Sequence, residues 1–425
     1  GLRPDLAQAI AELHPKFIRF PGGCVAHGMG LHNIYRWKDT IGPVEQRRGQ
    51  KNFWNYYQSV GLGYFEYFQF CEDIGARPVP ILAAGVSCPH SDQKRGKGQQ
   101  SIPLADMPAY IQDIHDLIEW ANGPATTRWG AQRAQAGHPA PFGLKYLGIG
   151  NEDAISPEFK ERFKMIQDAI EQQHPEITVI GTAGSQPEGA DFDQGWQFAR
   201  GIHTPMVDEH YYRPPQWFFD NLNRYDRYDR KGPKVYAGEY AAQESNHVNT
   251  LRTALAEAAY MTALERNGDV VQLSSYAPLL AKQGHTQWRP DMIYFDNTRI
   301  LLSANYHVQQ MFGQNHGDIY LPVTVAADAT MLAASCVRNS QSGEVILKLV
   351  NGSAVAVTAK VDLSDIGKLD PAATLTVLSG EPDAHNTFEN PAAVAPRCEP
   401  ITVSGTFACE LPANSLCLIR MNTRH

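Results

Sequence analysis

Two glutamates follow short apolar runs that are typical of buried strands. Glu152 comes shortly after a run that ends in Gly150, and Glu239 directly follows a run that ends in Gly238. Charged residues are seldom buried without a partner or a function. Hydrolysis of a glycosidic bond needs a carboxyl pair, because one group protonates the leaving oxygen while the other attacks the anomeric carbon. For either glutamate alone, a solvated strand end is as good an explanation as catalysis. The two glutamates together favour catalysis. We expect the small glycines to let a sugar ring approach.

Further polar side chains lie at or near the ends of expected strands. Arg19 and Cys24 flank a Pro-Gly-Gly turn, and Asn151 directly precedes the first glutamate. His210 and Tyr212 occupy alternate positions of the expected strand near residue 208. For His210 a structural hydrogen bond is an equally good interpretation. Tyr212 also suits a core aromatic residue whose hydroxyl is satisfied.

The elements that must position these residues alternate between helix and strand as far as about residue 300. Such alternation indicates parallel strands joined by crossover helices. A (β/α)₈ TIM barrel has eight strands and presents its functional groups at their C-terminal ends. The chain opens with a helix-like segment, so we expect the first barrel strand to lie upstream of Gly1. An open doubly wound sheet is the rival, but no glycine-rich phosphate loop supports it. The expected strands lie near residues 18, 82, 148, 179, 208, 237 and 273.

The length of the chain indicates two domains. The 425 residues exceed the ~250–300 at which a single core usually stops growing. After an expected helix at Ser303–Phe312, short β-rich runs alternate with turns such as Asn351-Gly352-Ser353. This pattern is typical of an antiparallel β-sandwich. We therefore predict a catalytic barrel over residues 1–312 and a C-terminal β-sandwich over residues 313–425.

Composition argues against several classes of partner. The net charge of −8 disfavours nucleic acid, which attracts basic surfaces. The longest apolar run, Val79–Val86, is far shorter than the ~20 residues of a membrane span. The seven cysteines form no Cys-x-x-Cys motif, and their odd number gives little support for a disulfide scaffold. Cys398 and Cys409 are close enough in sequence to pair, although spacing does not decide it. We predict no cofactor and no bound metal.

Several motifs resemble the α-L-arabinofuranosidases of glycoside hydrolase family 51. They occur in family order over most of residues 1–300, and one more lies in the expected sandwich. The motifs are Arg19-Phe20-Pro21-Gly22-Gly23, Tyr35-Arg36-Trp37-Lys38-Asp39-Thr40-Ile41-Gly42-Pro43, Gly148-Ile149-Gly150-Asn151-Glu152, His210-Tyr211-Tyr212, Ala237-Gly238-Glu239-Tyr240 and Phe388-Glu389-Asn390-Pro391.

The resemblance implies a retaining hydrolysis of terminal α-L-arabinofuranosyl residues from arabinan, arabinoxylan or their oligosaccharides. Glu152 matches the family's general acid/base on the fourth barrel strand, and Glu239 matches its nucleophile on the seventh. Glu239 would attack the anomeric carbon while Glu152 protonates the leaving oxygen, and Glu152 would then activate water to hydrolyse the ester. Retention requires a carboxyl separation of about 5–5.5 Å, whereas inversion requires about 6.5–9.5 Å.

The same resemblance implies substrate-binding roles. Asn151 matches the residue that hydrogen-bonds the sugar 2-hydroxyl. Arg19 matches an arginine that braces the nucleophile, whose charge would keep Glu239 ionised. His210 and Tyr212 match a pair on the sixth strand near the acid/base and the nucleophile.

Two positions depart from the common family pattern. Many members have Asn after Pro-Gly-Gly, where this chain has Cys24, a weaker hydrogen-bonding group. Beyond the eighth strand some members place a glutamine against the sugar, and Asp291 is the candidate for that place here. A further sugar-binding glutamate of some members belongs to the first strand, which we expect to precede this chain.

Three other functions remain open. An endo-β-glucanase of the same family would use the same two glutamates in an open cleft. A non-catalytic carbohydrate-binding barrel would be expected to lack one of them. Metal-assisted hydrolysis would need clustered ligands, whereas His210 is nearly alone at the strand ends and Cys24 has no evident ligand partner in the sequence.

The cellular setting is not fixed by the sequence. We expect a soluble protein that contacts neither membrane nor nucleic acid, and a homo-oligomer is compatible with the sequence. Polysaccharide debranching favours a secreted or periplasmic location, whereas short oligosaccharides favour the cytoplasm.

Overall fold

The computed structural model describes residues 1–91, 98–325 and 331–423. The chain forms two compact units, each made of more than one stretch of sequence. The first unit comprises Pro15–His210 and Arg230–Gly238. The second unit comprises Gly1–His14, Tyr211–Asp229 and Glu239–His425.

Seven strands of the described residues form the large sheet, and they follow one another in chain order. They are β1 (Phe17–Phe20), β4 (Arg77–Leu82), β5 (Tyr146–Ile149), β6 (Thr178–Thr182), β7 (Met206–Arg213), β8 (Lys234–Ala242) and β9 (Val271–Tyr276). Neighbouring strands from β1 to β7 pair in parallel. Each strand coincides with a predicted one, and this order is that of a (β/α)₈ barrel. The predicted fold class is confirmed, with seven of the eight barrel strands in the described residues.

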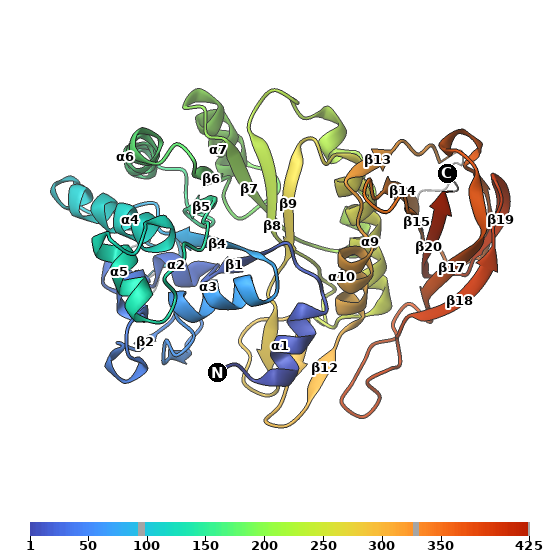
Figure 1. Ribbon diagram of the computed structural model, residues 1–425, viewed down its shortest axis with the longest axis horizontal. Helices are drawn as coiled ribbons and strands as arrows, with labels where there is room; N and C mark the ends of the chain where they lie inside the picture. Colours follow the sequence, from blue (N-terminus) through green and yellow to red (C-terminus); the bar gives the residue numbers. More distant parts are fainter. Residues whose placement is uncertain (92–97, 326–330, 424–425) are drawn as a thin grey trace. The chain divides into compact units, whose positions relative to one another are not determined.

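Helices separate the strands along the chain. They are α1 (Pro4–Ala11), α2 (Cys24–His27), α3 (Tyr64–Asp73), α4 (Met107–Asn122), α5 (Arg128–Gln135), α6 (Pro157–Gln173), α7 (Ala190–Gly201), α8 (Pro215–Asp220), α9 (Leu251–Arg266) and α10 (Ala304–Gln314). Single 3₁₀ turns lie at Leu31–Asn33, Trp37–Thr40, Val44–Gln46, Leu104–Asp106, Arg224–Arg227 and Ser364–Ile366. In the first unit, α3 runs along the adjacent strands β1 and β4 (Figure 1).

The helix α6, directly after the candidate acid/base, shows how the sequence determines these elements. Ser156 accepts a hydrogen bond from the backbone N–H of Phe159 at 3.2 Å and so caps the helix, while Pro157 occupies the first turn. The buried side chains Phe159, Phe163 and Ile170 recur at helical spacing and belong to the core of the first unit. The cap and the apolar face together fix where the loop between β5 and α6 ends.

Each unit also contains a small sheet of short strands. In the second unit, a three-stranded sheet contains β10 (Leu280–Lys282), β11 (Ile293–Phe295) and β12 (Ile300–Leu302), which the sequence pattern did not predict. In the first unit, β2 (Gln50–Lys51) and β3 (Tyr57–Gln58) form a two-stranded ladder. Strands this short contain too few residues to show an alternating pattern.

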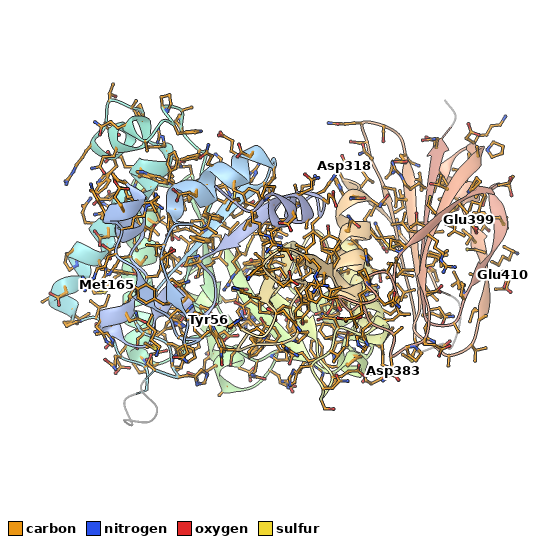
Figure 2. All side chains as sticks on the ribbon, turned by 90° about the horizontal axis from the view of Figure 1, so that it is seen from below. Tyr56, Met165, Asp318, Asp383, Glu399 and Glu410 are labelled. Atoms are coloured by element: carbon orange, nitrogen blue, oxygen red, sulfur yellow. The ribbon has the colours of Figure 1, made fainter. Side chains whose placement is uncertain are left out.

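The C-terminal part of the second unit is antiparallel, as predicted. A six-stranded sheet (Figure 1) has the order β13-β14-β15-β20-β17-β18. The strand β16 pairs with β19 in a separate two-stranded sheet. The strands are β13 (Ile319–Leu321), β14 (Leu332–Arg338), β15 (Val345–Asn351), β16 (Val357–Asp362), β17 (Leu369–Ser379), β18 (Arg397–Thr402), β19 (Thr406–Leu411) and β20 (Ser415–Thr423). Glu399 of β18 and Glu410 of β19 are exposed on these strands (Figure 2). The apolar faces of the two sheets share one core cluster.

Two general features concern the cysteines and the membrane. All seven cysteines lie in the described residues and are free, so Cys398 and Cys409 do not form a disulfide. Among the described residues, no helix has the length and apolar character needed to cross a bilayer.

Candidate active site

The backbone at Glu152 is held in an unusual conformation at the C-terminal end of β5. Its φ angle is +54°, in the left-handed region that a non-glycine residue rarely adopts. The backbone N–H of Glu152 donates to Oγ1 of Thr182 at 3.2 Å, which helps to hold this turn. Such conformations persist where the surroundings enforce them, and they cluster at functional sites. The side chain is 17% exposed, so it is open to a substrate.

An imidazole contacts the Glu152 carboxylate. Nδ1 of His210 lies 2.7 Å from Oε1 of Glu152, and Nε2 of His210 lies 3.2 Å from Oδ2 of Asp208. Alternate residues of a strand point to the same face, which explains why Asp208 and His210 of β7 act together. Glu209, between them, instead accepts a hydrogen bond from Nε1 of Trp196 at 2.8 Å. A histidine with a carboxylate at each nitrogen can hold a proton next to Glu152.

In the first unit, a guanidinium connects β1 with the turn after β5 and with β7. Arg19 of β1 donates a hydrogen bond to Oδ1 of Asn151 and lies 3.6 Å from Oδ2 of Asp208. Asn151 is buried, and its backbone N–H donates to Oδ2 of Asp153 at 2.8 Å. The predicted bracing of Glu239 by Arg19 stays a prediction. The hydrogen bond from Arg19 fixes the side-chain amide of Asn151.

The two glycines that precede the glutamates make room for buried aspartates. A Cβ at Gly150, whose φ is +94°, would lie 2.3 Å from Oδ2 of Asp153. A Cβ at Gly238 would lie 2.0 Å from Oδ1 of Asp208. The sequence did not reveal this role. The expectation that these glycines let a sugar ring approach stays a prediction.

In the second unit, Glu239 has a phenol as its partner. Oη of Tyr212 donates to Oε2 of Glu239 at 2.8 Å, and Glu239 is 8% exposed. The ring of Tyr212 packs edge-to-face against Trp288, with centroids 5.2 Å apart. The hydroxyl orients the carboxylate, and the indole fixes the phenol. Tyr212 is thus more than a core aromatic residue with a satisfied hydroxyl.

Asp291 is buried between β10 and β11 of the second unit. Its backbone N–H donates to Oη of Tyr294 at 3.0 Å, and Tyr294 in turn donates to Oδ1 of Asn249 at 2.8 Å. Burial raises the pKa of the Asp291 carboxyl to about 8. Its Oδ2 has no hydrogen-bond partner among the described residues. A carboxyl in this state can donate a hydrogen bond to an incoming hydroxyl group.

Cys24 has neighbours that its place in the sequence did not reveal. The side chains of Cys24, His27 and Cys88 converge, and all three are buried. The sequence did not reveal these partners of Cys24, because Cys88 is distant in the chain and follows a different strand. Within the described residues of the first unit, this is the cluster whose donor atoms suit a metal ion.

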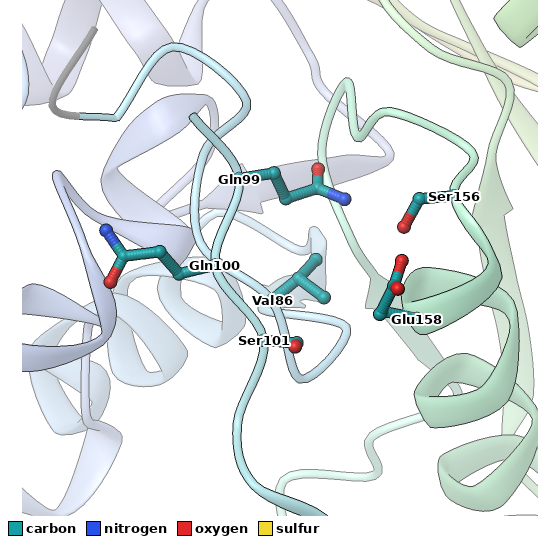
Figure 3. Close-up of a pocket in the computed structure, with 6 residues that line it drawn as sticks. All are labelled: Val86, Gln99, Gln100, Ser101, Ser156 and Glu158. Carbon is teal, nitrogen blue, oxygen red and sulfur yellow. The ribbon is translucent and has the colours of Figure 1, made fainter. Parts of the chain in front are cut away.

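A pocket lies beside the loop between β5 and α6 in the first unit. It has a volume of about 460 Å³ and is lined by Val86, Gln99, Gln100, Ser101, Ser156 and Glu158 (Figure 3). The amide of Gln99 donates to the carbonyl of Ala154 at 3.0 Å and accepts from its N–H at 3.0 Å. Gln99 therefore anchors the loop that follows Glu152, and the polar lining suits hydroxylated molecules.

Asp208 and Asp153 are two residues of this site whose roles the sequence did not reveal. Both are buried aspartates with a histidine partner, since Asp153 lies 3.1 Å from Nδ1 of His27. The alternation in β7 was the available signal for Asp208. Thr182 and Trp288 were missed because neither residue type marks a site by itself.

Comparisons with known proteins agree with this geometry. Residues 9–230 match the family model described as "Alpha-L-arabinofuranosidase 1 domain", and residues 228–415 match "Alpha-L-arabinofuranosidase C-terminal domain". The extracellular exo-α-L-arabinofuranosidase of Streptomyces chartreusis is 50% identical over 76% of this chain and 39% of that protein. α-L-Arabinofuranosidase 1 of Arabidopsis thaliana is 33% identical over 93% of this chain and 57% of that protein. This chain thus spans about two fifths to three fifths of these relatives.

Solved structures show the same fold. An arabinose-bound GH51 α-L-arabinofuranosidase superposes with a TM-score of 0.89 at 34% identity, and the match covers 100% of this chain and 67% of that one. The arabinose complex of α-L-arabinofuranosidase from Thermotoga maritima has a TM-score of 0.77 at 19% identity, covering 99% of this chain and 90% of that one. At that lower identity the likeness concerns the fold alone.

Proposed function

This chain belongs to the α-L-arabinofuranosidase family, glycoside hydrolase family 51, and on that premise we propose that it hydrolyses terminal α-L-arabinofuranosyl residues. The substrates would be arabinan, arabinoxylan or their oligosaccharides. The observation that supports catalysis most strongly is that the two glutamates have chemically different partners. Glu152 contacts an imidazole, whereas Glu239 accepts a hydrogen bond from a phenol.

Different partners suit two carboxyl groups with different tasks. A retaining glycosidase needs one carboxyl that carries a proton and one that is ionised, and their surroundings set the difference. We assign the acid/base role to Glu152, because His210 can exchange a proton with it. We assign the nucleophile role to Glu239, because a hydroxyl donor orients its carboxylate.

The reaction would then proceed by double displacement. Glu239 attacks the anomeric carbon as Glu152 protonates the departing oxygen, and the bond between the anomeric carbon and that oxygen breaks. Glu152, now ionised, removes a proton from water, which attacks the glycosyl ester and releases arabinose with its configuration retained. Glu239 leaves as a carboxylate, and Glu152 has regained its proton.

The remaining predicted residues would bind the sugar. Asn151, oriented by Arg19, is assigned to the 2-hydroxyl, where a hydrogen bond strengthens as charge develops on the ring. Tyr212 is assigned to positioning Glu239. Cys24 and Asp291 are assigned to contacts at the edge of the sugar site.

The domain organisation and setting complete the proposal. We place the border between the barrel and the sandwich near residue 313, since α10 ends at Gln314 and β13 opens the six-stranded sheet at Ile319. The Streptomyces relative is named as extracellular. A location outside the cytoplasm would give this chain access to polysaccharide.

A hydrolysis panel tests the proposed activity. The purified protein is incubated with an aryl α-L-arabinofuranoside, arabinan, arabinoxylan and a soluble β-glucan, and released sugars are measured. We expect arabinose from the first three substrates and no products from the glucan, with all turnover lost in Glu239→Ala. Cleavage of the glucan in preference to the arabinosides would overturn the substrate assignment and favour an endo-glucanase. Failure on all four would overturn the activity.

A further inference from the structure

Three buried side chains of the first unit bring together donor atoms of the kinds that bind zinc. The sulfur atoms of Cys24 and Cys88 and a ring nitrogen of His27 all lie within 4.8 Å of one another. Cys24 and His27 are three residues apart on the single turn of α2, so they share one face. Cys88 comes from the segment that follows β4. Cys24 is 5% exposed, and the other two are fully buried.

The histidine of this cluster is already oriented. Nδ1 of His27 lies 3.1 Å from Oδ1 of Asp153, and its Nε2 is buried without a hydrogen-bond partner among the described residues. A buried polar atom without a partner is costly, which calls for an explanation. Metal-binding histidines characteristically hold a carboxylate at one ring nitrogen and the metal at the other. Asp153 and His27 have that arrangement.

Two cysteine sulfurs and one histidine nitrogen are ligand types that zinc prefers, and three of them suffice for a zinc site. Zinc prefers thiolate and imidazole ligands, at about 2.3 Å from sulfur and about 2.0–2.1 Å from nitrogen. In a tetrahedral site these bonds place ligand atoms roughly 3.5–3.8 Å apart. The observed cluster falls within reach of that geometry by small side-chain adjustments. Three protein ligands leave the fourth position for water or a substrate atom.

We propose that Cys24, His27 and Cys88 form a zinc site, oriented by Asp153. The site ties α2 to the segment after β4, and through Asp153 to Asn151, whose backbone N–H donates to the same carboxylate. The zinc therefore holds the loop that leads to Glu152. This site does not depend on the proposed hydrolysis, because its test measures bound metal.

The test starts with the wild-type protein and needs no variant to fold. The protein is expressed with zinc, dialysed, and its metal content measured by mass spectrometry. The apoprotein is then titrated with Co²⁺ while the thiolate-to-cobalt charge-transfer band and proton release are recorded. We expect about one zinc per chain and a thiolate band, with protons released as the ligands bind the ion. Substoichiometric zinc together with no thiolate band would overturn the proposal, as would a Cys24–Cys88 disulfide in the unreduced protein.

Variants then assign the ligands. Cys88→Ser and His27→Gln should lose stoichiometric zinc, and Asp153→Asn should weaken zinc binding by about 10–100-fold. The matched control is Cys71→Ala, which removes another buried thiol of the first unit outside this cluster. Circular dichroism checks that each variant is folded. Full zinc content in both folded ligand variants would contradict the assignment, even if the arabinosidase activity were confirmed.

Discussion

Nδ1 of His210 lies 2.7 Å from Oε1 of Glu152, and the other ring nitrogen of His210 faces Asp208. The strained turn after β5 thus places the candidate acid/base next to an imidazole. Glu239 instead accepts a hydrogen bond from the hydroxyl of Tyr212.

Replacing His210 should impair proton transfer more than binding. His210→Phe removes the imidazole from Glu152, and we expect kcat/KM to fall by about 10²-fold or more on substrates with poor leaving groups. Aryl substrates with good leaving groups should lose less in the glycosylation step, since they need little protonation. The measurement is a series of aryl arabinofuranosides of graded leaving-group acidity. His138→Gln is the control, because His138 forms a similar 2.7 Å pair with Glu72 away from this site. An equal loss across the series would argue that His210 is structural.

Replacing the phenol of Tyr212 should slow nucleophilic attack. Tyr212→Phe removes the 2.8 Å hydrogen bond to Glu239 but keeps the ring against Trp288. Loss of a hydrogen bond to a charged group costs about 1.5–3 kcal/mol, which corresponds to a glycosylation rate roughly 10–100-fold lower. Stopped-flow kinetics of the first turnover measures this step. Tyr211→Phe, at the neighbouring position of β7, should leave it unchanged, and a similar loss in both variants would point to a general disturbance of the strand.

The close approach at Gly238 should make its replacement damaging. Gly238→Ala places a Cβ where Oδ1 of Asp208 lies 2.0 Å away, so Asp208 must move from Arg19 and His210. We expect a loss of about 1–3 kcal/mol in the free energy of unfolding, together with lower kcat/KM. Urea denaturation measures the first quantity. Gly201→Ala meets no atom within 4 Å and should change stability little. Wild-type stability and activity in Gly238→Ala would show that the space at Asp208 is not needed.

A buried carboxyl in the second unit should make stability depend on pH. Burial raises the pKa of Glu257 to about 8, whereas an unfolded glutamate titrates near ~4.3. Between these values the folded state keeps a proton that the unfolded state loses, so stability falls as pH rises, by up to about 1.4 kcal/mol per pH unit. Below ~4.3 and above about 8 this contribution is flat. Glu257→Gln should remove this part of the slope in denaturation curves, and the same change at the exposed Glu381 should not. An unchanged slope in Glu257→Gln would mean that Glu257 is ionised in the folded protein.

The sequence predicted the barrel strands well because buried parallel strands are continuous apolar runs between turn residues. It predicted β5 and the polar residues that follow it for that reason. It did not predict β14 or β19, which are rich in small residues such as Ala334 and Ala408. Strong β-forming side chains were the signal used, and these strands contain few of them.

The candidate site was predictable in its residue types but not in its contacts. Glu152 and Glu239 could be chosen because an acidic residue after an apolar run is unusual. The roles of Gly150 and Gly238 could not, because the contacts of these glycines with Asp153 and Asp208 depend on the folded backbone. The left-handed backbone at Glu152 likewise arises from its surroundings, since glutamate has no intrinsic preference for it.

Azide rescue with an aryl α-L-arabinofuranoside that has a good leaving group distinguishes the acid/base Glu152 from the nucleophile Glu239. Azide can replace water on the glycosyl ester of Glu152→Ala, and it can replace the missing carboxylate in Glu239→Ala. Proton NMR of the product reports the anomeric configuration. We expect the α-arabinofuranosyl azide from Glu152→Ala and the inverted β-azide from Glu239→Ala. The opposite pairing of products, or the same anomer from both variants, would overturn these assignments.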